Sequence, residues 1–192
     1  SYESMTRTVR TVAEAGVIPL DIGGDHSIAI GSVSGTKMAF PDQRLGVVWI
    51  DAHADLHSPW TTPSGNVHGM PLALLMQIEK KGKNRPRVYT MDTWDRLRKI
   101  GVSGPKLLPS DLVFIALRDY EQEEEAIIKE HGIKAVQGLA DSSVAASFGA
   151  VEKTLEHTMA EDDGEAPISG APSVSETCLT VKCLSRATSS SF

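Results

Sequence analysis

A six-residue apolar run passes directly into an acidic, histidine-containing motif, and this junction limits what the chain can fold into. Residues 45–50 (LGVVWI) have the continuous apolar character of a strand buried on both faces of a parallel sheet. The motif that follows, residues 51–55, reads DAHAD. In an extended backbone alternate side chains share a face, so Asp51, His53 and Asp55 are expected to point the same way. Two carboxylates and one imidazole on one face form half of a divalent-metal site, and ligands gather beyond the carboxyl ends of parallel strands.

The rest of the chain alternates between strand-like and helix-like segments. Short apolar runs predict strands at 17–22, 45–51, 112–117 and 133–136. Helical spacing of apolar residues predicts helices at about 5–16, 28–39 (capped by Ser27), 68–78, 122–131 and 146–159, whereas residues 80–92 are basic and irregular. This alternation predicts right-handed βαβ units and a three-layer α/β/α fold with a central parallel sheet.

Composition excludes several classes of function. The net charge is −6 and no basic block occurs, which argues against a nucleic-acid-binding surface. No apolar stretch approaches the roughly 20 residues that a transmembrane helix needs, and no signal-peptide pattern is present at the start. The two cysteines, Cys178 and Cys183, are too few for a disulfide framework. We therefore expect a cytoplasmic protein without a membrane or nucleic-acid partner.

Chemically reactive side chains gather in the loops that follow the predicted strands. The first loop has the sequence GGDHS (23–27), and the loop after DAHAD contains SGNVHG (64–69). The strand at 112–117 ends in Arg118-Asp119. Four of the six histidines lie in these loops, within one stretch of 43 residues: His26, His53, His57 and His68. An isolated Asp-x-His-x-Asp motif is more often a solvated loop than a metal site, but three different motifs, in order on successive strand ends, favour a metal site.

These motifs carry a resemblance to a known family. GGDHS, DAHAD and SGNVHG, in this order and spacing, resemble the ureohydrolases and, within them, the arginases; the agmatinase branch shares the first two motifs. The resemblance covers roughly residues 1–160. It implies an α/β fold with a central parallel sheet and a pair of manganese ions bridged by a hydroxide. It also implies hydrolysis of the guanidino group of L-arginine to L-ornithine and urea.

The resemblance assigns roles to individual side chains. His26, Asp51 and Asp55 resemble ligands of one manganese ion, and Asp51 and His53 resemble ligands of the other, with Asp51 bridging. His68 resembles the group that passes a proton to the leaving amine, which suits an imidazole because its charge changes near neutral pH. The residues that resemble the substrate-binding groups are Thr62, Ser64 and Asn66 with His57 for the α-carboxylate, and Asp119 and Glu121 for the α-amino group.

The sequence departs from the family pattern at three places. His57 occupies a position where arginases usually carry asparagine, and Glu121 occupies one where aspartate is expected. The family's second Asp-x-Asp metal motif is expected soon after Pro167-Ile168, yet no aspartate occurs after Asp163. We therefore predict that the second manganese ion binds weakly or not at all. A change of reading frame or an alternative exon would explain the altered end.

Several alternatives follow from these departures. We expect a partial arginase-like domain over residues 1–165 and a divergent tail over 166–192, in which 178–184 could form one strand. The chain is then either an active hydrolase, a catalytically inactive isoform or interaction subunit, or a related guanidino hydrolase such as an agmatinase. The family implies a homo-oligomer such as a trimer. His57 is either a surface residue or a pocket residue, and the acidic run 123–125 is either a solvated helix start or a segment whose Glu124 faces the pocket.

Overall fold

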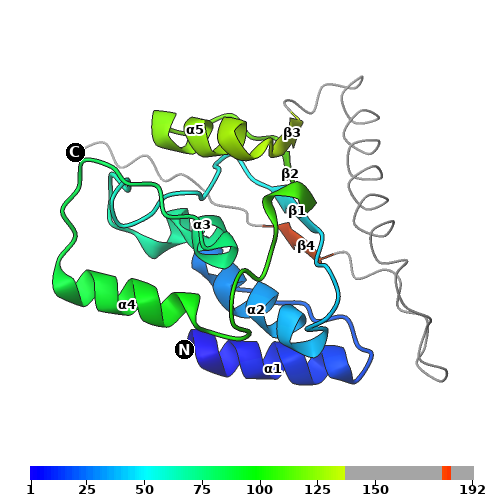
Figure 1. The fold of residues 1–192 in the computed structure, drawn as a ribbon. Helices are drawn as coiled ribbons and strands as arrows, with labels where there is room; N and C mark the ends of the chain where they lie inside the picture. The colour runs from blue at the N-terminus through cyan, green and yellow to red at the C-terminus, as the bar shows by residue number, and fades with distance from the viewer. Residues whose placement is uncertain (137–178, 183–192) are drawn as a thin grey trace.

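The computed structural model describes residues 1–136 and the backbone of residues 179–182. Its centre is a parallel sheet of four strands in the order β3-β2-β1-β4 (Figure 1). The strands are β1 (Val47–Ile50), β2 (Leu112–Ile115), β3 (Lys134–Val136) and β4 (Leu179–Lys182). The predicted α/β fold with a parallel sheet is therefore confirmed, as are the strands predicted at 45–51, 112–117 and 133–136.

Strand β1 is paired along both edges. On one edge β2 runs parallel to it, from Val47 opposite Leu112 to Ile50 opposite Ile115. On the other edge β4 runs parallel, from Val47 opposite Leu179 to Ile50 opposite Lys182. The strand that the sequence allows within residues 178–184 is thus confirmed. The division into residues 1–165 and 166–192 stays a prediction.

The strand predicted at residues 17–22 is wrong. The segment forms no helix or strand, and its apolar side chains are exposed, Ile18 by 90% and Ile22 by 89%. A strand needs a partner with free backbone groups, and β1 has none to offer because β2 and β4 take both of its edges. Residues 17–22 are therefore largely apolar, like a strand, but have no edge of β1 to pair with.

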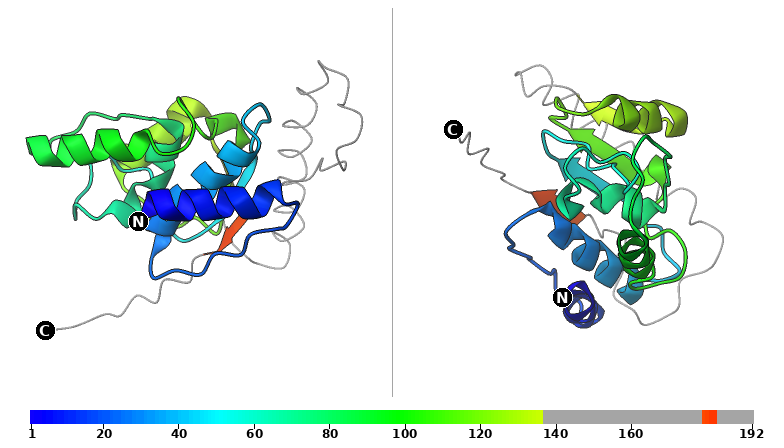
Figure 2. Two further views of the ribbon diagram at one scale, coloured as in Figure 1. Left: turned by 90° about the horizontal axis from the view of Figure 1, so that it is seen from below. Right: turned by 90° about the vertical axis from the view of Figure 1, so that its left-hand side faces the viewer.

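Five α-helices lie within the described residues. They are α1 (Tyr2–Glu14), α2 (Ala29–Ala39), α3 (Pro71–Met76), α4 (Val88–Arg98) and α5 (Gln122–His131), with short 3-10 turns η1 (His26–Ile28), η2 (Val67–Gly69) and η3 (Pro109–Asp111). Helix α5 lies at one end of the molecule and α1 at the other, with α2 and α3 between them (Figures 1 and 2). The predicted helix at 146–159 lies outside the described residues. No helix in the described part of the chain has the length and apolarity to cross a membrane.

Three details of the helix prediction need correction. Asp25, not Ser27, is the cap: its carboxylate accepts the backbone N–H of Ser27 at 2.9 Å, and it begins η1 rather than α2. The segment expected at 68–78 is divided into η2 and α3 because Pro71 starts a new helix at its first turn. Residues 80–92 are not irregular throughout, because α4 begins at Val88; its buried Trp94 and Leu97 lie three residues apart on one face.

Alternate strand residues and three helices form the main core. Val47 and Trp49 of β1 and Leu112 and Phe114 of β2 belong to one buried cluster with residues of α2, α3 and α5. The intervening residues Val48 and Val113 are buried as well, so both faces of the central strands are covered. This accounts for the continuous apolar run at residues 45–50.

Two glycines let α1 lie close against α2. A Cβ atom added to Gly35 would be 2.7 Å from the backbone oxygen of Thr6 and 2.7 Å from the Cβ of Val9. A Cβ atom on Gly31 would meet the flexible side chain of Met5, at 2.8 Å from its sulfur. The small residues of α2 thus set the distance between these helices, and α2 leads directly from the His26 turn.

Candidate active site

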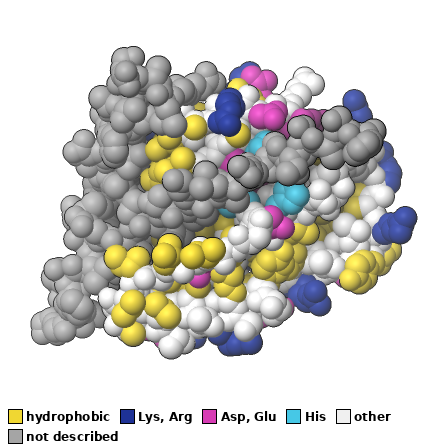
Figure 3. Space-filling model, turned by 180° about the vertical axis from the view of Figure 1, so that it is seen from behind, with side chains coloured by type: hydrophobic (Ala, Val, Ile, Leu, Met, Phe, Trp, Pro, Cys, Tyr) yellow, Lys and Arg dark blue, Asp and Glu magenta, His cyan; other side chains and the backbone are white. Residues whose placement is uncertain are grey.

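A cavity of about 350 Å³ opens beyond the carboxyl ends of β1 and β2. Histidine and acidic side chains gather on one face of the molecule (Figure 3). Ten of the eleven predicted site residues line the cavity: His26, Asp51, His53, Asp55, His57, Thr62, Ser64, His68, Asp119 and Glu121. The eleventh, Asn66, is not among the lining residues. The sheet therefore brings together side chains that are up to 95 positions apart (26 to 121) in the sequence.

The loop after β1 is held by backbone hydrogen bonds to the loop after β2. The carbonyl of Ala52 accepts the N–H groups of Arg118 and Asp119, both at 2.9 Å. The strand ends at Ile50, and Asp55 adopts the left-handed region with φ 52°. Strand alternation is therefore the wrong explanation for the shared direction of Asp51 and Asp55: a turn brings the second carboxylate back toward the first.

Three buried side chains converge at the floor of the cavity. The Nδ1 atom of His26 lies 3.0 Å from Oδ2 of Asp51 and 2.8 Å from Oδ2 of Asp55. Ligand atoms of these three residues lie within 4.8 Å of one another. The ring of His26 stacks on Trp49 with a centroid distance of 3.8 Å, so a core side chain of β1 fixes a residue from a distant loop. These three residues are the ligands predicted for one metal ion.

The residues of this cluster fit a divalent cation. Both ring nitrogens of His26 and Oδ2 of Asp55 are buried without a hydrogen bond of acceptable geometry. Buried polar atoms normally have a hydrogen-bond partner, so buried atoms without one indicate another partner, such as a bound ion. One imidazole nitrogen and two carboxylate oxygens are ligands that first-row divalent metals accept.

The cluster also shifts the pKa values of its members. Burial by itself lowers the pKa of His26, but the carboxylates of Asp51 and Asp55 outweigh it and raise the pKa above its usual value. Burial by itself raises the pKa of Asp51, but interactions with His26 and with the backbone and ring of His53 outweigh it and lower the pKa. The carboxylate form of Asp51 is therefore stabilised in the folded chain.

Asp51 faces His53 with its second oxygen. Its Oδ1 atom accepts the backbone N–H of His53 at 2.9 Å and lies 3.1 Å from the Nδ1 of that ring. The His53 side chain is half exposed, and its Nε2 lies 3.7 Å from Oδ2 of Asp119. The two oxygens of Asp51 thus point to two different imidazoles, which is the arrangement expected of a bridging carboxylate.

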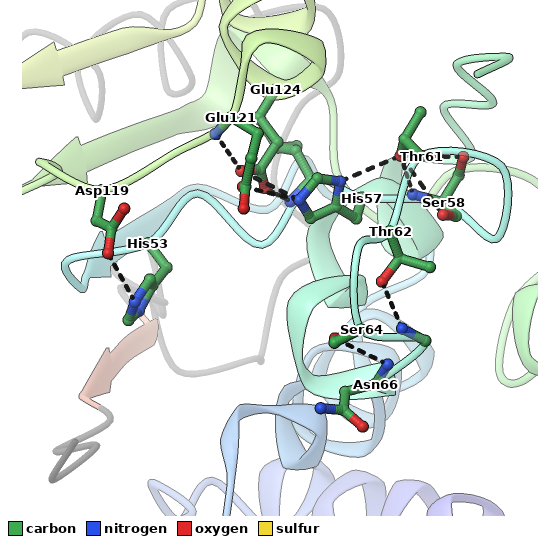
Figure 4. Close-up of polar contacts among 12 residues, drawn as sticks. His53, His57, Ser58, Thr61, Thr62, Ser64, Asn66, Asp119, Glu121 and Glu124 are labelled. Atoms are coloured by element: carbon green, nitrogen blue, oxygen red, sulfur yellow. Dashed lines mark hydrogen bonds and ion pairs between the residues drawn. The ribbon is translucent and has the colours of Figure 1, made fainter. Parts of the chain in front are cut away.

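His57 belongs to a second cluster with two glutamates (Figure 4). Its Nε2 atom lies 2.9 Å from Glu121 and 3.5 Å from Glu124, and its Nδ1 atom lies 3.2 Å from the hydroxyl of Thr61. The His57 side chain is 7% exposed. It is therefore a pocket residue, and the surface alternative is wrong.

Glu124 lines the cavity as well, which decides the open question about the acidic run 123–125. Its side chain is 3% exposed and accepts the backbone N–H groups of Leu56 at 2.9 Å and Glu121 at 3.1 Å. Burial raises the pKa of Glu124 to about 8, and Glu121 adds to this effect. The pKa of Glu121 is lowered, first by its hydrogen bond with Glu124. The sequence does carry a signal for Glu124. It lies three residues after Glu121, the cap residue of α5, which is the spacing of a capping box.

The loop at residues 62–69 supplies hydroxyl groups. The hydroxyl of Thr62 accepts the N–H of Gly65 at 3.0 Å, and that of Ser64 accepts the N–H of Asn66 at 3.2 Å (Figure 4). Each hydroxyl still has a proton to donate toward the cavity. His68 lies on η2 and lines the cavity as an exposed imidazole. Asn66 precedes η2 as its cap residue.

Comparison with known proteins identifies relatives of this chain. The model of the Arginase family matches residues 1–164. The arginase of Coccidioides immitis (strain RS) is 40% identical over 136 residues, which cover 69% of this chain and 39% of the relative. Arginase-1 of Homo sapiens is 43% identical over 132 residues, covering 69% of this chain and 37% of the relative.

Solved structures agree with this comparison. The crystal structure of arginase from Bacillus subtilis subsp. subtilis str. 168 matches with a TM-score of 0.65 and 35% identity, over 83% of this chain and 49% of that one. The arginase from Bacillus caldovelox matches with a TM-score of 0.59 and 34% identity, over 83% of this chain and 46% of that one. The chain therefore spans less than half the length of these relatives. On its sequence and its fold, the chain belongs to the arginase family.

Proposed function

We propose that this chain is a manganese-dependent ureohydrolase that hydrolyses the guanidino group of L-arginine to L-ornithine and urea. The observation that carries the proposal is the convergence of His26, Asp51 and Asp55 at the floor of a cavity also lined by hydroxyl and carboxylate groups. The names of the relatives, each an arginase, support it. The oligomeric state and the cytoplasmic location stay predictions.

The chain's own residues divide the work of hydrolysis. His26, Asp51 and Asp55 would hold one Mn²⁺ ion, and Asp51 with His53 would contribute to a second. Such ions would lower the pKa of a bound water to about 7 and so would supply hydroxide at neutral pH. The exposed imidazole of His68 can move between cavity and solvent and can pass a proton to the leaving amine.

The opposite wall of the cavity would orient the amino-acid end of the substrate. Thr62 and Ser64 line the cavity, and Asn66, just after them, completes the proposed carboxylate-binding loop. Asp119 and Glu121 are acidic, as a site for an α-amino group requires. A cavity of about 350 Å³ is large enough for a molecule of this size.

One observation favours a second substrate class, a guanidino amine such as agmatine. Both ring nitrogens of His57 lie within hydrogen-bonding distance of the chain's own groups, Thr61 and Glu121. This imidazole is therefore occupied and does not offer a free donor to a substrate carboxylate. The nearby carboxylate of Glu121, whose pKa is lowered, also favours a cationic over a zwitterionic substrate end.

Another observation favours an inactive chain. Among the described residues, Asp51 and His53 are the two ligands proposed for the second metal ion, and the sequence has no aspartate after Asp163. Removing carboxylates from a two-metal site weakens the negative potential that holds two dications close together. We therefore infer that the second ion binds more weakly than the first.

The test is urea release from the purified chain as Mn²⁺ is added, with L-arginine and agmatine as parallel substrates. Saturable urea release that is faster with L-arginine supports the proposal, and preference for agmatine supports the second substrate class. Absence of urea from both substrates at saturating Mn²⁺ overturns hydrolysis by this chain. The Asp51→Asn variant serves as the blank for contaminating activity.

A further inference from the structure

We propose that Glu124 is a positioning residue whose buried carboxyl group ties the metal-binding loop 51–57 to the N-terminus of α5. Its contribution to turnover rests on the function proposed above, whereas its effect on the loop does not. Through this tie the chain fixes Asp55 at the metal end of the cavity relative to Glu121 at the opposite wall.

The tie consists of two hydrogen bonds accepted by the two oxygens of one carboxyl group. Oε1 of Glu124 accepts the N–H of Leu56, the residue directly after Asp55, at 2.9 Å. Oε2 accepts the N–H of Glu121 at 3.1 Å. Leu56 is fully buried and Glu124 is 3% exposed, so water does not compete for these donors. The two segments that Glu124 joins are 65 or more residues apart in the sequence (56 and 121).

Two backbone hydrogen bonds hold this loop on the side of α3, in addition to the bonds of Ala52 with the loop after β2. The N–H of Leu72 in α3 donates to the carbonyl of Asp55 at 3.1 Å, and the N–H of His57 donates to the carbonyl of Gly69 at 3.0 Å. Leu56 lies between these two anchored residues, and the acceptor for its N–H comes from α5. Loss of the Glu124 side chain therefore removes the acceptor that links the backbone of Leu56 to α5, whereas the His57–Glu121 pair and the bonds of Ala52 and of the α3 side remain.

The same contacts argue against Glu124 as a ligand of an additional metal ion. It lies close to His57 and Glu121, and these three residues form a group with the composition of a metal site. However, each Glu124 oxygen already accepts a backbone N–H, and the His57 ring is paired with Glu121 at 2.9 Å. The group satisfies itself, as a structural network does.

Hydrogen exchange in the metal-free chain tests the tie directly. We expect Glu124→Ala to speed amide exchange at residues 51–57 and 121–124 by about tenfold or more, because both segments lose an acceptor, with no change in α1. We also expect the Mn²⁺ affinity of Glu124→Ala to fall by about 10–100-fold, the usual effect of removing a residue that supports metal ligands. Glu125→Ala is the matched control, because Glu125 is the next residue on α5 and pairs with solvent-facing Lys129.

Glu124→Gln keeps the test decisive if the alanine variant does not fold. The amide has one acceptor oxygen, so it can satisfy Leu56 or Glu121 but not both, and exchange should rise in one segment and remain slow in the other. Unchanged exchange in both segments of either folded variant overturns the proposal. Absence of urea release from the wild-type chain would reject the proposed function, whereas the exchange result would still decide the role of Glu124.

Discussion

At the scale of single residues, Asp51 has the largest number of roles in the site. One of its oxygens lies 3.0 Å from His26 and the other 3.1 Å from His53, and the side chain is buried. Both imidazoles favour its ionised form, which is the form that binds metal. The position at the end of β1 makes this possible, since the N–H of Asp51 still donates to Ile115 of β2 at 3.2 Å.

The Asp51→Asn variant should lose metal binding without losing the fold. The amide keeps the size of the carboxylate but lacks its charge. We therefore expect Mn²⁺ affinity to fall by at least about 100-fold, because removing a residue that only supports a ligand already lowers it by about 10–100-fold. Calorimetric titration with Mn²⁺ measures this. Asp42→Asn, at an exposed position, is the control and should bind as the wild type does. Equal affinity of the Asp51 variant and the wild type would contradict the assignment.

The raised pKa of Glu124 predicts a pH-dependent stability difference. An unfolded glutamate has a pKa near 4.5, whereas the folded value is about 8. Between these values the folded chain binds more protons than the unfolded chain, so stability from this group is present at low pH and falls as pH rises. The stability of the wild type relative to Glu124→Gln should therefore decline from about pH 4.5 to 8, by at most about 1.4 kcal/mol per pH unit.

Urea denaturation of both proteins in the presence of a chelator, at several pH values, measures this difference. Glu125→Gln is the control, since its difference from the wild type should not decline in this manner. A constant difference between the wild type and Glu124→Gln across this range would show that the carboxylate is already ionised at low pH.

At the scale of elements, the contact between α1 and α2 depends on a residue without a side chain. Gly35 faces the backbone of Thr6 and the side chain of Val9, neither of which can move aside easily. Gly31 faces the side chain of Met5, which is flexible. The two glycines therefore differ in how much an added methyl group would destabilise the chain, although both lie in the same helix.

Gly35→Ala should destabilise the chain by about 1–3 kcal/mol, as expected for an overpacked contact. In Gly31→Ala the Met5 side chain can shift, and the gain of up to about 1 kcal/mol in helix propensity offsets the strain. The free energies of unfolding of the two variants, measured by urea denaturation, check the comparison. A Gly35→Ala variant as stable as Gly31→Ala would show that α1 does not pack as described.

At the scale of the whole molecule, one site connects segments that are far apart in the chain. The His26 turn, the β1 loop and the residues after β2 meet at one end of the sheet, and the cavity lies among them. A ligand that binds this arrangement and not the unfolded chain stabilises the fold as a whole.

Mn²⁺ should therefore raise the thermal midpoint of the chain, and a chelator should lower it again. At a free Mn²⁺ concentration of 100 times the dissociation constant, the stabilisation is about 2.7 kcal/mol. Differential scanning calorimetry with and without Mn²⁺ measures the shift, and Asp55→Asn should reduce it. Mg²⁺ at the same concentration is the control, because a site with a buried imidazole suits Mn²⁺ better. An equal shift with both ions would point to nonspecific binding.

The sequence alone determined the parallel sheet and was enough to predict ten of the residues that line the cavity. Apolar runs buried on both faces, each followed by polar chemistry, are enough to predict β1, β2 and their loops, because only the ends of parallel strands collect such residues at one edge. The tertiary structure decided which segment pairs with β1: β4 occupies the edge, and residues 17–22, which are also largely apolar, do not. It also decided the places of His57 and Glu124, whose burial depends on contacts across 64 to 68 positions in the chain. Composition and spacing describe only a few neighbouring residues. Strand pairing and the burial of a carboxyl group depend on segments that come together only when the chain has folded.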